Sequence, residues 1–177
     1  ELLDIPLKRP FGIATGAQLA ADNVLIEIEL EDGTTGLGEA APFEAVNGET
    51  QGAVIDAAAA AADFVTGKDA RSWRPLATEL RTVLPRTPSL RCAIEMALLD
   101  ALTRQARLPL WAFFGGATTT LESDLTVTTG GVDEARQDAI AATRLGFRTL
   151  KIKVGGADLD EDVARVRAIH AAAPEAS

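Results

Sequence analysis

The 177-residue sequence predicts an α+β region, an antiparallel sheet with helices, followed by the first two units of a parallel β/α arrangement. Two observations predict the first part: a strand pair joined by Asp32-Gly33, and long segments with apolar residues at helical spacing. The third observation is that strand and helix patterns alternate in the last third of the chain. The pair Gly115-Gly116 separates the two patterns, so we expect domains at residues 1–116 and 117–177.

The N-terminal segment predicts a small antiparallel sheet. Residues 2–7 form a candidate edge strand, because the prolines of this stretch cannot donate to a strand ladder. Residues 8–23 are expected to form an irregular loop, and residues 24–30 then alternate apolar and polar side chains as a strand does. Asp32-Gly33 is a typical hairpin turn, so residues 35–39 are expected to return as the partner strand.

The middle of the chain is expected to be helical. Apolar residues recur at helical spacing over residues 49–65 and, most clearly, over residues 89–106. Residues 72–84 predict another helix, with Pro75 in its first turn, where proline is tolerated. The single cysteine, Cys92, has apolar neighbours, and we expect it to be a buried, inert thiol.

Four alternating elements are predicted after the glycine pair: strand 122–128, helix 133–145, strand 149–154 and helix 160–173. Short connections between such elements are typical of parallel βα units. The acidic residues from Asp158 to Asp162 complement the positive end of the last helix. They are therefore interpreted as a solvated first turn in preference to a cation site.

Composition and charge exclude several classes of partner. The formal net charge of −9 argues against nucleic acid and against an anionic membrane. No apolar stretch is long enough to cross a bilayer, and the first residues lack the pattern of a signal peptide. One cysteine excludes an intramolecular disulfide framework and fits a reducing compartment. We therefore expect a soluble, cytoplasmic protein.

The most informative motif is the run from Thr149 to Gly156, in which two lysines alternate with apolar residues. Side chains two residues apart on a strand share a face and stand roughly 6.6 Å apart, so Lys151 and Lys153 are expected to point the same way. Two neighbouring ammonium groups disfavour each other's charge, and burial disfavours it further. One lysine would then accept a proton near neutral pH. An exposed edge strand with a solvated lysine face is the alternative interpretation.

The order of these features resembles the enolase superfamily, within it the muconate-lactonizing subgroup, and most closely the dipeptide epimerases. The resemblance rests on residues 10–16, 32–42, 93–102, 110–116, 123–127 and 150–155. It implies an N-terminal capping domain followed by a TIM-type (β/α) barrel, of which residues 117–177 supply the first two of eight units. The chain is accordingly expected to be truncated, as part of a longer enzyme.

The resemblance also implies a reaction. Enzymes of this family remove the proton α to a substrate carboxylate, and Mg²⁺ stabilises the resulting enediolate. Lys153 matches the base, Lys151 matches the neighbour that disfavours its charge, and Thr126 matches a position that helps to hold the substrate. The capping loop, which would close over the substrate, supplies three further candidates: Phe11, Ile13 and Thr15.

The family's metal carboxylates and its opposing lysine lie on later barrel strands. The resemblance therefore implies that no metal ligand lies in this chain, that the Mg²⁺ ligands lie beyond residue 177, and that the chain alone is inactive. Members of the family often assemble into higher oligomers, so a homo-oligomer is expected.

Three functions remain open at this point. The first is a magnesium-dependent racemase or epimerase, most like those of dipeptides. The second is a cycloisomerase or an o-succinylbenzoate synthase of the same superfamily, because these enzymes also use paired lysines. The third is a non-catalytic binding module whose lysines hold a carboxylate. Residues 13–23 contain no lysine or arginine, so an apolar or mixed dipeptide is as consistent with the sequence as an acidic one.

Overall fold

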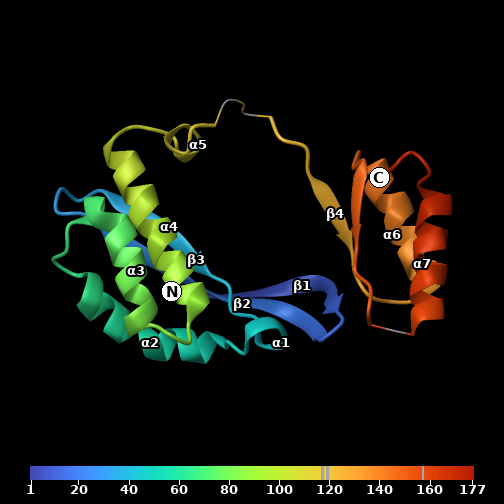
Figure 1. Cartoon of the computed structure of the whole chain (residues 1–177), viewed down its shortest axis with the longest axis horizontal. Coiled ribbons are helices and arrows are strands. Elements are labelled where there is room, and N and C mark those ends of the chain that lie inside the picture. The colour runs from blue at the N-terminus through green and yellow to red at the C-terminus, as the bar shows by residue number, and fades with distance from the viewer. Residues whose placement is uncertain (117, 119, 157) are drawn as a thin grey trace. The chain divides into compact units, whose positions relative to one another are not determined.

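The computed structural model describes most of the chain, namely residues 1–116, 118, 120–156 and 158–177. These residues belong to two units (Figure 1). Unit 1 consists of Glu1–Pro6 and Ala20–Thr119, and unit 2 consists of Leu7–Leu19 and Thr120–Ser177. A segment near the N-terminus thus belongs with the C-terminal part of the chain. The domain boundary expected between residues 116 and 117 involves a residue outside the described ones, and it stays a prediction.

Three strands form one sheet in the order β1-β2-β3 (Figure 1): β1 (Leu2–Ile13), β2 (Gly16–Glu29) and β3 (Thr35–Ala40). The irregular loop expected over residues 8–23 is wrong, because these residues continue β1 and begin β2 on either side of the turn Ala14-Thr15. Proline and glycine gave this stretch the composition of a loop. However, β1 lies at the edge of the sheet that the described residues form, and proline is tolerated on an edge strand because its outer side needs no ladder partner.

The second hairpin has the predicted form. β2 and β3 are antiparallel, and Ile26 pairs with Gly38. Gly33 has a φ of 82°, a conformation that glycine adopts without steric cost. The carboxylate of Asp32 accepts a hydrogen bond from Thr34 N at 3.0 Å, which closes the turn.

Helices form the rest of the secondary structure described in unit 1. They are α1 (Glu44–Asn47), α2 (Gln51–Val65), the 3-10 helix η1 (Ala70–Ser72), α3 (Trp73–Val83), α4 (Pro88–Gln105) and α5 (Leu110–Phe113). The three predicted helices, which correspond to α2, α3 and α4, are confirmed to within two residues at each end. Their apolar faces and the sheet enclose a core that includes Val24, Val54, Leu80 and Leu90.

Two glycines let α4 approach β3 closely. A Cβ added to Gly36 would collide with the helix backbone at Ala97 and Ala101. A Cβ added to Gly38 would collide with the backbone of Ala93. Small residues therefore face each other along this contact, which brings the strand and the helix axis together at the centre of unit 1.

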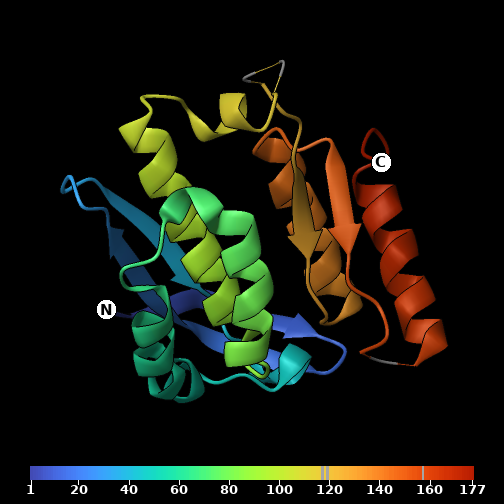
Figure 2. The same ribbon diagram turned by 60° about the vertical axis from the view of Figure 1, so that its left-hand side comes forward.

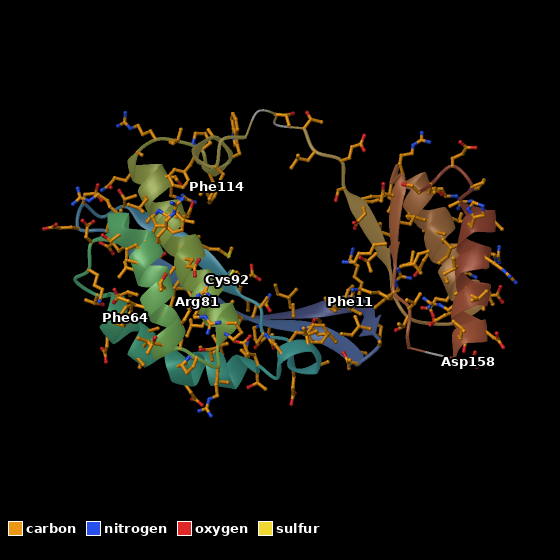
Figure 3. All side chains as sticks on the ribbon, viewed as in Figure 1. Phe11, Phe64, Arg81, Cys92, Phe114 and Asp158 are labelled. Atoms are coloured by element: carbon orange, nitrogen blue, oxygen red, sulfur yellow. The ribbon has the colours of Figure 1, made fainter. Side chains whose placement is uncertain are left out.

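Cys92 is exposed, so the expectation of a buried thiol is wrong (Figure 3). An α-helix turns about 100° per residue, and its buried face is occupied here by Ala93 and Ile94. Cys92 lies on the outer face with Met96, one turn further along. Apolar neighbours in sequence thus did not mean burial for this residue.

Unit 2 alternates strands and helices in the predicted order. Its elements after the hairpin are β4 (Asp124–Val127), α6 (Val132–Arg144), β5 (Thr149–Ile152) and α7 (Leu159–Ala172). The two strands are parallel neighbours and are shorter than predicted (Figure 2). Both helices pack against one face of this sheet, around Val127, Ala139, Leu150 and Ile169.

The fold class is confirmed, because an antiparallel sheet with helices precedes two parallel βα units. Among the helices of the described residues, none is long and apolar enough to cross a membrane.

Candidate active site

The sheet of unit 2 has a covered face and an open face. Leu150 and Ile152 belong to the cluster that packs on α6 and α7 together with Val127. Lys151 pairs in register with Thr126 on β4. Because successive side chains of a strand alternate between faces, Thr126 and Lys151 stand on the open face, opposite the helices. The structure thus brings together two of the residues that the sequence selected.

Lys153 follows β5 directly and is half-buried. Its backbone N donates to Val127 O at 2.9 Å, so the strand ladder continues for one residue beyond the strand. The alternation therefore also places Lys153 on the open face with Lys151. Both lysines lie at or near the carboxyl end of β5, the end at which open βα sheets bind ligands.

The tip of the β1–β2 hairpin lies against the segments that follow both strands. Thr129 N, two residues after β4, donates to Gly12 O at 3.4 Å. A Cβ added to Gly12 would collide with the Thr129 hydroxyl. On the other strand, the Cβ of Ala14 lies 3.5 Å from the place that a Cβ on Gly155 would take. Within unit 2 the hairpin therefore reaches the carboxyl ends of both β4 and β5.

Phe11 and Thr126 line a groove of about 720 Å³ between the hairpin and β4. Figure 3 shows Phe11 on the hairpin. Ile13, at the end of β1, and Thr15, in the turn, lie closer to the hairpin tip. Ile13, Thr15, Lys151 and Lys153 are not among the described residues that line this groove, whereas Lys8 is. Phe11 is half-buried and Thr15 is exposed. The selected residues thus lie around the strand ends of unit 2 without all meeting in one cavity.

One ion pair ties the hairpin to α6. Arg9 Nη1 lies 2.6 Å from Asp138 Oδ1, and the side chain of Asp138 is 13% exposed. The hydrogen bond and the charge of Asp138 raise the pKa of the Arg9 guanidinium above its ordinary value, and the charge of Glu134 adds to this. Arg9 therefore stays charged, and the acidic side chains of Asp138 and Glu134 compensate its charge.

A second ion pair, the buried pair of Arg165 and Asp162, was not predicted from the sequence. Arg165 of α7 is 1% exposed, and Asp162, one turn earlier, is 8% exposed. The acidic run at the start of α7 is thus only partly a solvated first turn: Asp158 accepts from Glu161 N as a helix cap, but Asp162 points inward. The sequence did contain a pattern that indicates such a pair: Asp162 and Arg165 are three residues apart, on a helix side that is otherwise apolar.

The described residues do not form a magnesium site. No group of three or more His, Cys, Asp or Glu side chains placed to hold a metal ion occurs among them. Two acidic residues follow the segment from Lys153 to Gly155, and both are engaged: Asp158 by the backbone, and Asp162 by the backbone and by Arg165. No chemical step is therefore assigned to a metal ion through these residues.

Comparison with known proteins identifies the family. The N-terminal domain of the mandelate racemase/muconate lactonizing enzyme family matches residues 3–115. The chain belongs to this family. An aromatic dipeptide epimerase from Herpetosiphon aurantiacus is 47% identical over 176 residues, which cover 99% of this chain and 49% of that enzyme. The family resemblance inferred from the residues is thereby confirmed.

Solved structures of the family match the fold. A mandelate racemase/muconate lactonizing protein from Herpetosiphon aurantiacus matches with a TM-score of 0.94 and 47% identity, over 99% of this chain and 49% of that chain. A dipeptide epimerase from Enterococcus faecalis, in complex with Mg and L-Leu-L-Tyr, matches with a TM-score of 0.92 and 31% identity. That match covers 97% of this chain and 48% of the other. The chain thus spans about half the length of these family members.

Proposed function

We propose that the protein carrying this chain is a magnesium-dependent dipeptide epimerase, an isomerase that removes the proton α to a substrate carboxylate. The observation that carries the proposal is the lysine pair, which stands at the carboxyl end of β5 on the face left open by the helices. Thr126 stands beside Lys151 in register on the same face. Dipeptide epimerase relatives, one of them solved with Mg and a dipeptide, support this assignment.

Lys153 is the proposed base. A neutral amine accepts a proton, and a neighbouring cation disfavours the protonated form, which is the part proposed for Lys151. Both side chains leave the same short segment, so their spacing is set by the strand itself. Thr126 is proposed to hold the substrate from the adjacent strand. Mg²⁺, bound by residues outside this chain, would supply charge stabilisation to the carboxylate when present.

The hairpin is the proposed cover of the site. Its tip contacts Thr129 and Gly155, which follow the two strands that carry the candidate residues. Phe11, Ile13 and Thr15 are proposed to contact the substrate and to exclude water from it. A cover anchored at both strand ends would hold a dipeptide over the lysine pair.

The substrate is proposed to be a dipeptide with uncharged, apolar side chains. An acidic side chain would need a cation near the hairpin. Residues 13–23 contain none, so Lys8, which lines the groove between the hairpin and β4, would have to supply it. Arg9, the nearest arginine, is paired with Asp138. The relatives named for aromatic dipeptides, or solved with L-Leu-L-Tyr, are in line with this preference.

The test uses the full-length protein with Mg²⁺ and L-Ala-L-Phe in deuterated water. Exchange of the α-proton is followed by NMR from the L,L and L,D isomers separately. We expect exchange from both isomers in the wild type, and loss of exchange from one of them in Lys153→Ala. Lys68→Ala, at an exposed lysine of unit 1, is the matched control and should leave both rates unchanged.

Three results would replace the proposal. Exchange from both isomers in Lys153→Ala would remove this lysine from its role. Turnover of a cycloisomerase or o-succinylbenzoate synthase substrate, without turnover of any dipeptide, would assign the other reactions of the superfamily. Tight binding of a carboxylate without exchange would assign a binding module. L-Ala-L-Glu in the same panel tests the substrate preference.

A further inference from the structure

Arg165 is a fully buried charge that contacts the backbone at the ends of β4 and β5, where the segment from Lys153 to Gly155, here called the lysine loop, begins. Its Nη1 donates to Lys153 O at 2.9 Å, and its Nη2 donates to Thr128 O at 2.6 Å. Nη1 also donates to Asp162 Oδ1 at 3.1 Å. Burying a guanidinium costs free energy that such bonds must offset. A buried arginine is therefore stable only where hydrogen-bond acceptors are placed to meet its N–H groups.

The two carbonyls belong to equivalent places on neighbouring strands. Thr128 is the first residue after β4, and Lys153 is the first residue after β5. The strand ladder reaches this point through the bond from Lys153 N to Val127 O. The planar fork of Arg165 then links the two chain segments beyond the ladder, and it fixes one carbonyl relative to the other.

Asp162 bonds the other end of the lysine loop, at Gly155. Its Oδ2 accepts a hydrogen bond from Gly155 N at 2.6 Å, while its Oδ1 accepts from Arg165. Gly155 has a φ of 89°, so the chain turns sharply at this residue. The segment from Lys153 to Gly155 is thus held at its first carbonyl by Arg165 and at its last amide by Asp162.

A contribution to folding stability alone explains the buried Arg165–Asp162 ion pair poorly. A buried ion pair is often no more stabilising than apolar residues of the same volume. Among the described residues, the Arg165 Nε is also buried without a hydrogen-bond partner. The bonds that Arg165 does make all go to Asp162 and to the backbone at the two strand ends.

We infer that Arg165 and Asp162 are positioning residues that fix the backbone from which the Lys153 side chain leaves. This inference rests on the proposed function, in which Lys153 is the base. A base must be held at a defined distance from the proton that it removes, and displacements of about 1 Å cost up to about a hundredfold in rate. Arg165 and Asp162 themselves touch only the backbone and each other in this network.

The test compares Arg165→Lys and Asp162→Asn with Arg167→Lys, the matched substitution at an exposed arginine of the same helix. Lysine keeps the charge but lacks the planar fork whose two nitrogens each bond one of the carbonyls. In the full-length protein, we expect Arg165→Lys to slow α-proton exchange by about tenfold or more from the isomer that Lys153 serves. Exchange from the other isomer, and KM for the dipeptide, should change less than about threefold. Arg167→Lys should match the wild type.

A second measurement reports on the loop without any chemistry. Backbone hydrogen exchange at Lys153 and Gly155 should become at least about tenfold faster in the folded Arg165→Lys protein, because their neighbouring bonds are lost. Asp162→Asn should accelerate exchange at Gly155 most strongly, since its carboxylate accepts that amide. If Arg165→Lys does not fold, Asp162→Asn carries both measurements.

The outcomes separate two kinds of failure. Equal loss of exchange from both isomers would show a merely structural role and overturn the inference, and so would unchanged rates in both variants. Faster loop exchange without any selective loss of catalysis would overturn it as well. Absence of α-proton exchange in the wild type would instead overturn the proposed function, and the inference with it.

Discussion

Gly38 is one of the two glycines at which β3 lies directly against the backbone of α4. Any side chain there would point at the backbone carbonyl of Ala93, which no rotamer change can move. Lys153 is the opposite case: within the part of the chain that the structure describes, its side chain makes no hydrogen bond or ion pair, while its backbone N and O are both bonded. Gly38 is thus constrained by the lack of space for a Cβ and Lys153 by the bonds of its peptide groups, so the two residues need different variants as tests.

We expect Gly38→Ala to lower the free energy of unfolding of the full-length protein by about 1–3 kcal/mol, the usual cost of overpacking. Gly52→Ala is the control: Gly52 lies in the first turn of α2, and a Cβ there meets only Thr50 Oγ1 at 3.9 Å. That substitution should raise stability by about 0.4–1 kcal/mol, because alanine loses less entropy than glycine on folding. Urea unfolding measures both, and equal effects of the two variants would contradict the close contact.

Helices and strands of this chain differ in how well the sequence predicts them. The helices of unit 1 are recognisable because apolar residues such as Leu90, Ile94 and Leu98 repeat at helical spacing. The β1–β2 hairpin was missed because Pro10 and Gly12 favour a loop locally, whereas pairing at a sheet edge decides the structure. Local pattern thus predicted the periodic elements, the β2–β3 hairpin and the parallel strands of unit 2, but not a hairpin whose residues have the composition of a loop.

In the candidate site too, the sequence predicts what depends on local period and misses what depends on contacts between distant segments. The face on which Lys151 stands follows from the two-residue period of a strand, so the sequence was sufficient for it. The buried Arg165 was not predictable in this way, because its partners Thr128 and Lys153 come from other elements. Hydrogen bonds between segments far apart in the chain leave no periodic signal.

Asp100 joins two elements, α4 and β3. Its Oδ2 accepts from Leu37 N at 2.9 Å and from Arg104 Nε at 2.8 Å. The hydrogen bond with Arg104 lowers the pKa of the Asp100 carboxyl, against an opposing effect of burial, and the Leu37 bond lowers it further. A carboxyl whose pKa is lower in the folded state stabilises the protein above its unfolded pKa of about 3.9. This contribution is lost as the pH falls through the folded pKa.

We therefore expect Asp100→Asn to lower the free energy of unfolding by about 0.5–1 kcal/mol at pH 7, a value reduced by solvent screening. The difference from the wild type should shrink below about pH 4 as the wild-type carboxyl is protonated. Asp133→Asn, at a side chain that is 90% exposed, is the control and should show little difference at either pH. A difference that is the same at pH 7 and pH 3 would remove the charge from this explanation.

At the scale of the molecule, unit 2 has apolar surface and strand edge that its own described residues leave uncovered. α7 exposes Leu159, Val163 and Val166 at 77%, 38% and 40%. Beside β5, Leu150 N donates to Ser177 O and Ser177 N donates to Arg148 O, both at 2.9 Å. This is the bonding that a further parallel strand would continue. Exposed apolar faces and strand edges associate with other chains unless they are covered.

We accordingly expect residues 1–177, expressed alone, to bind the dye ANS and to associate at micromolar concentration, as partly uncovered apolar surfaces do. They should give no α-proton exchange with L-Ala-L-Phe, whereas the full-length protein should exchange and bind little dye. The double variant Val163→Lys/Val166→Lys should reduce dye binding and association of residues 1–177, because it places charges on the exposed helix face. In the full-length protein, the same variant should lower stability if further chain covers α7. A monomeric, dye-free 1–177 protein, or a full-length variant as stable as the wild type, would show that this face is a solvent-exposed surface.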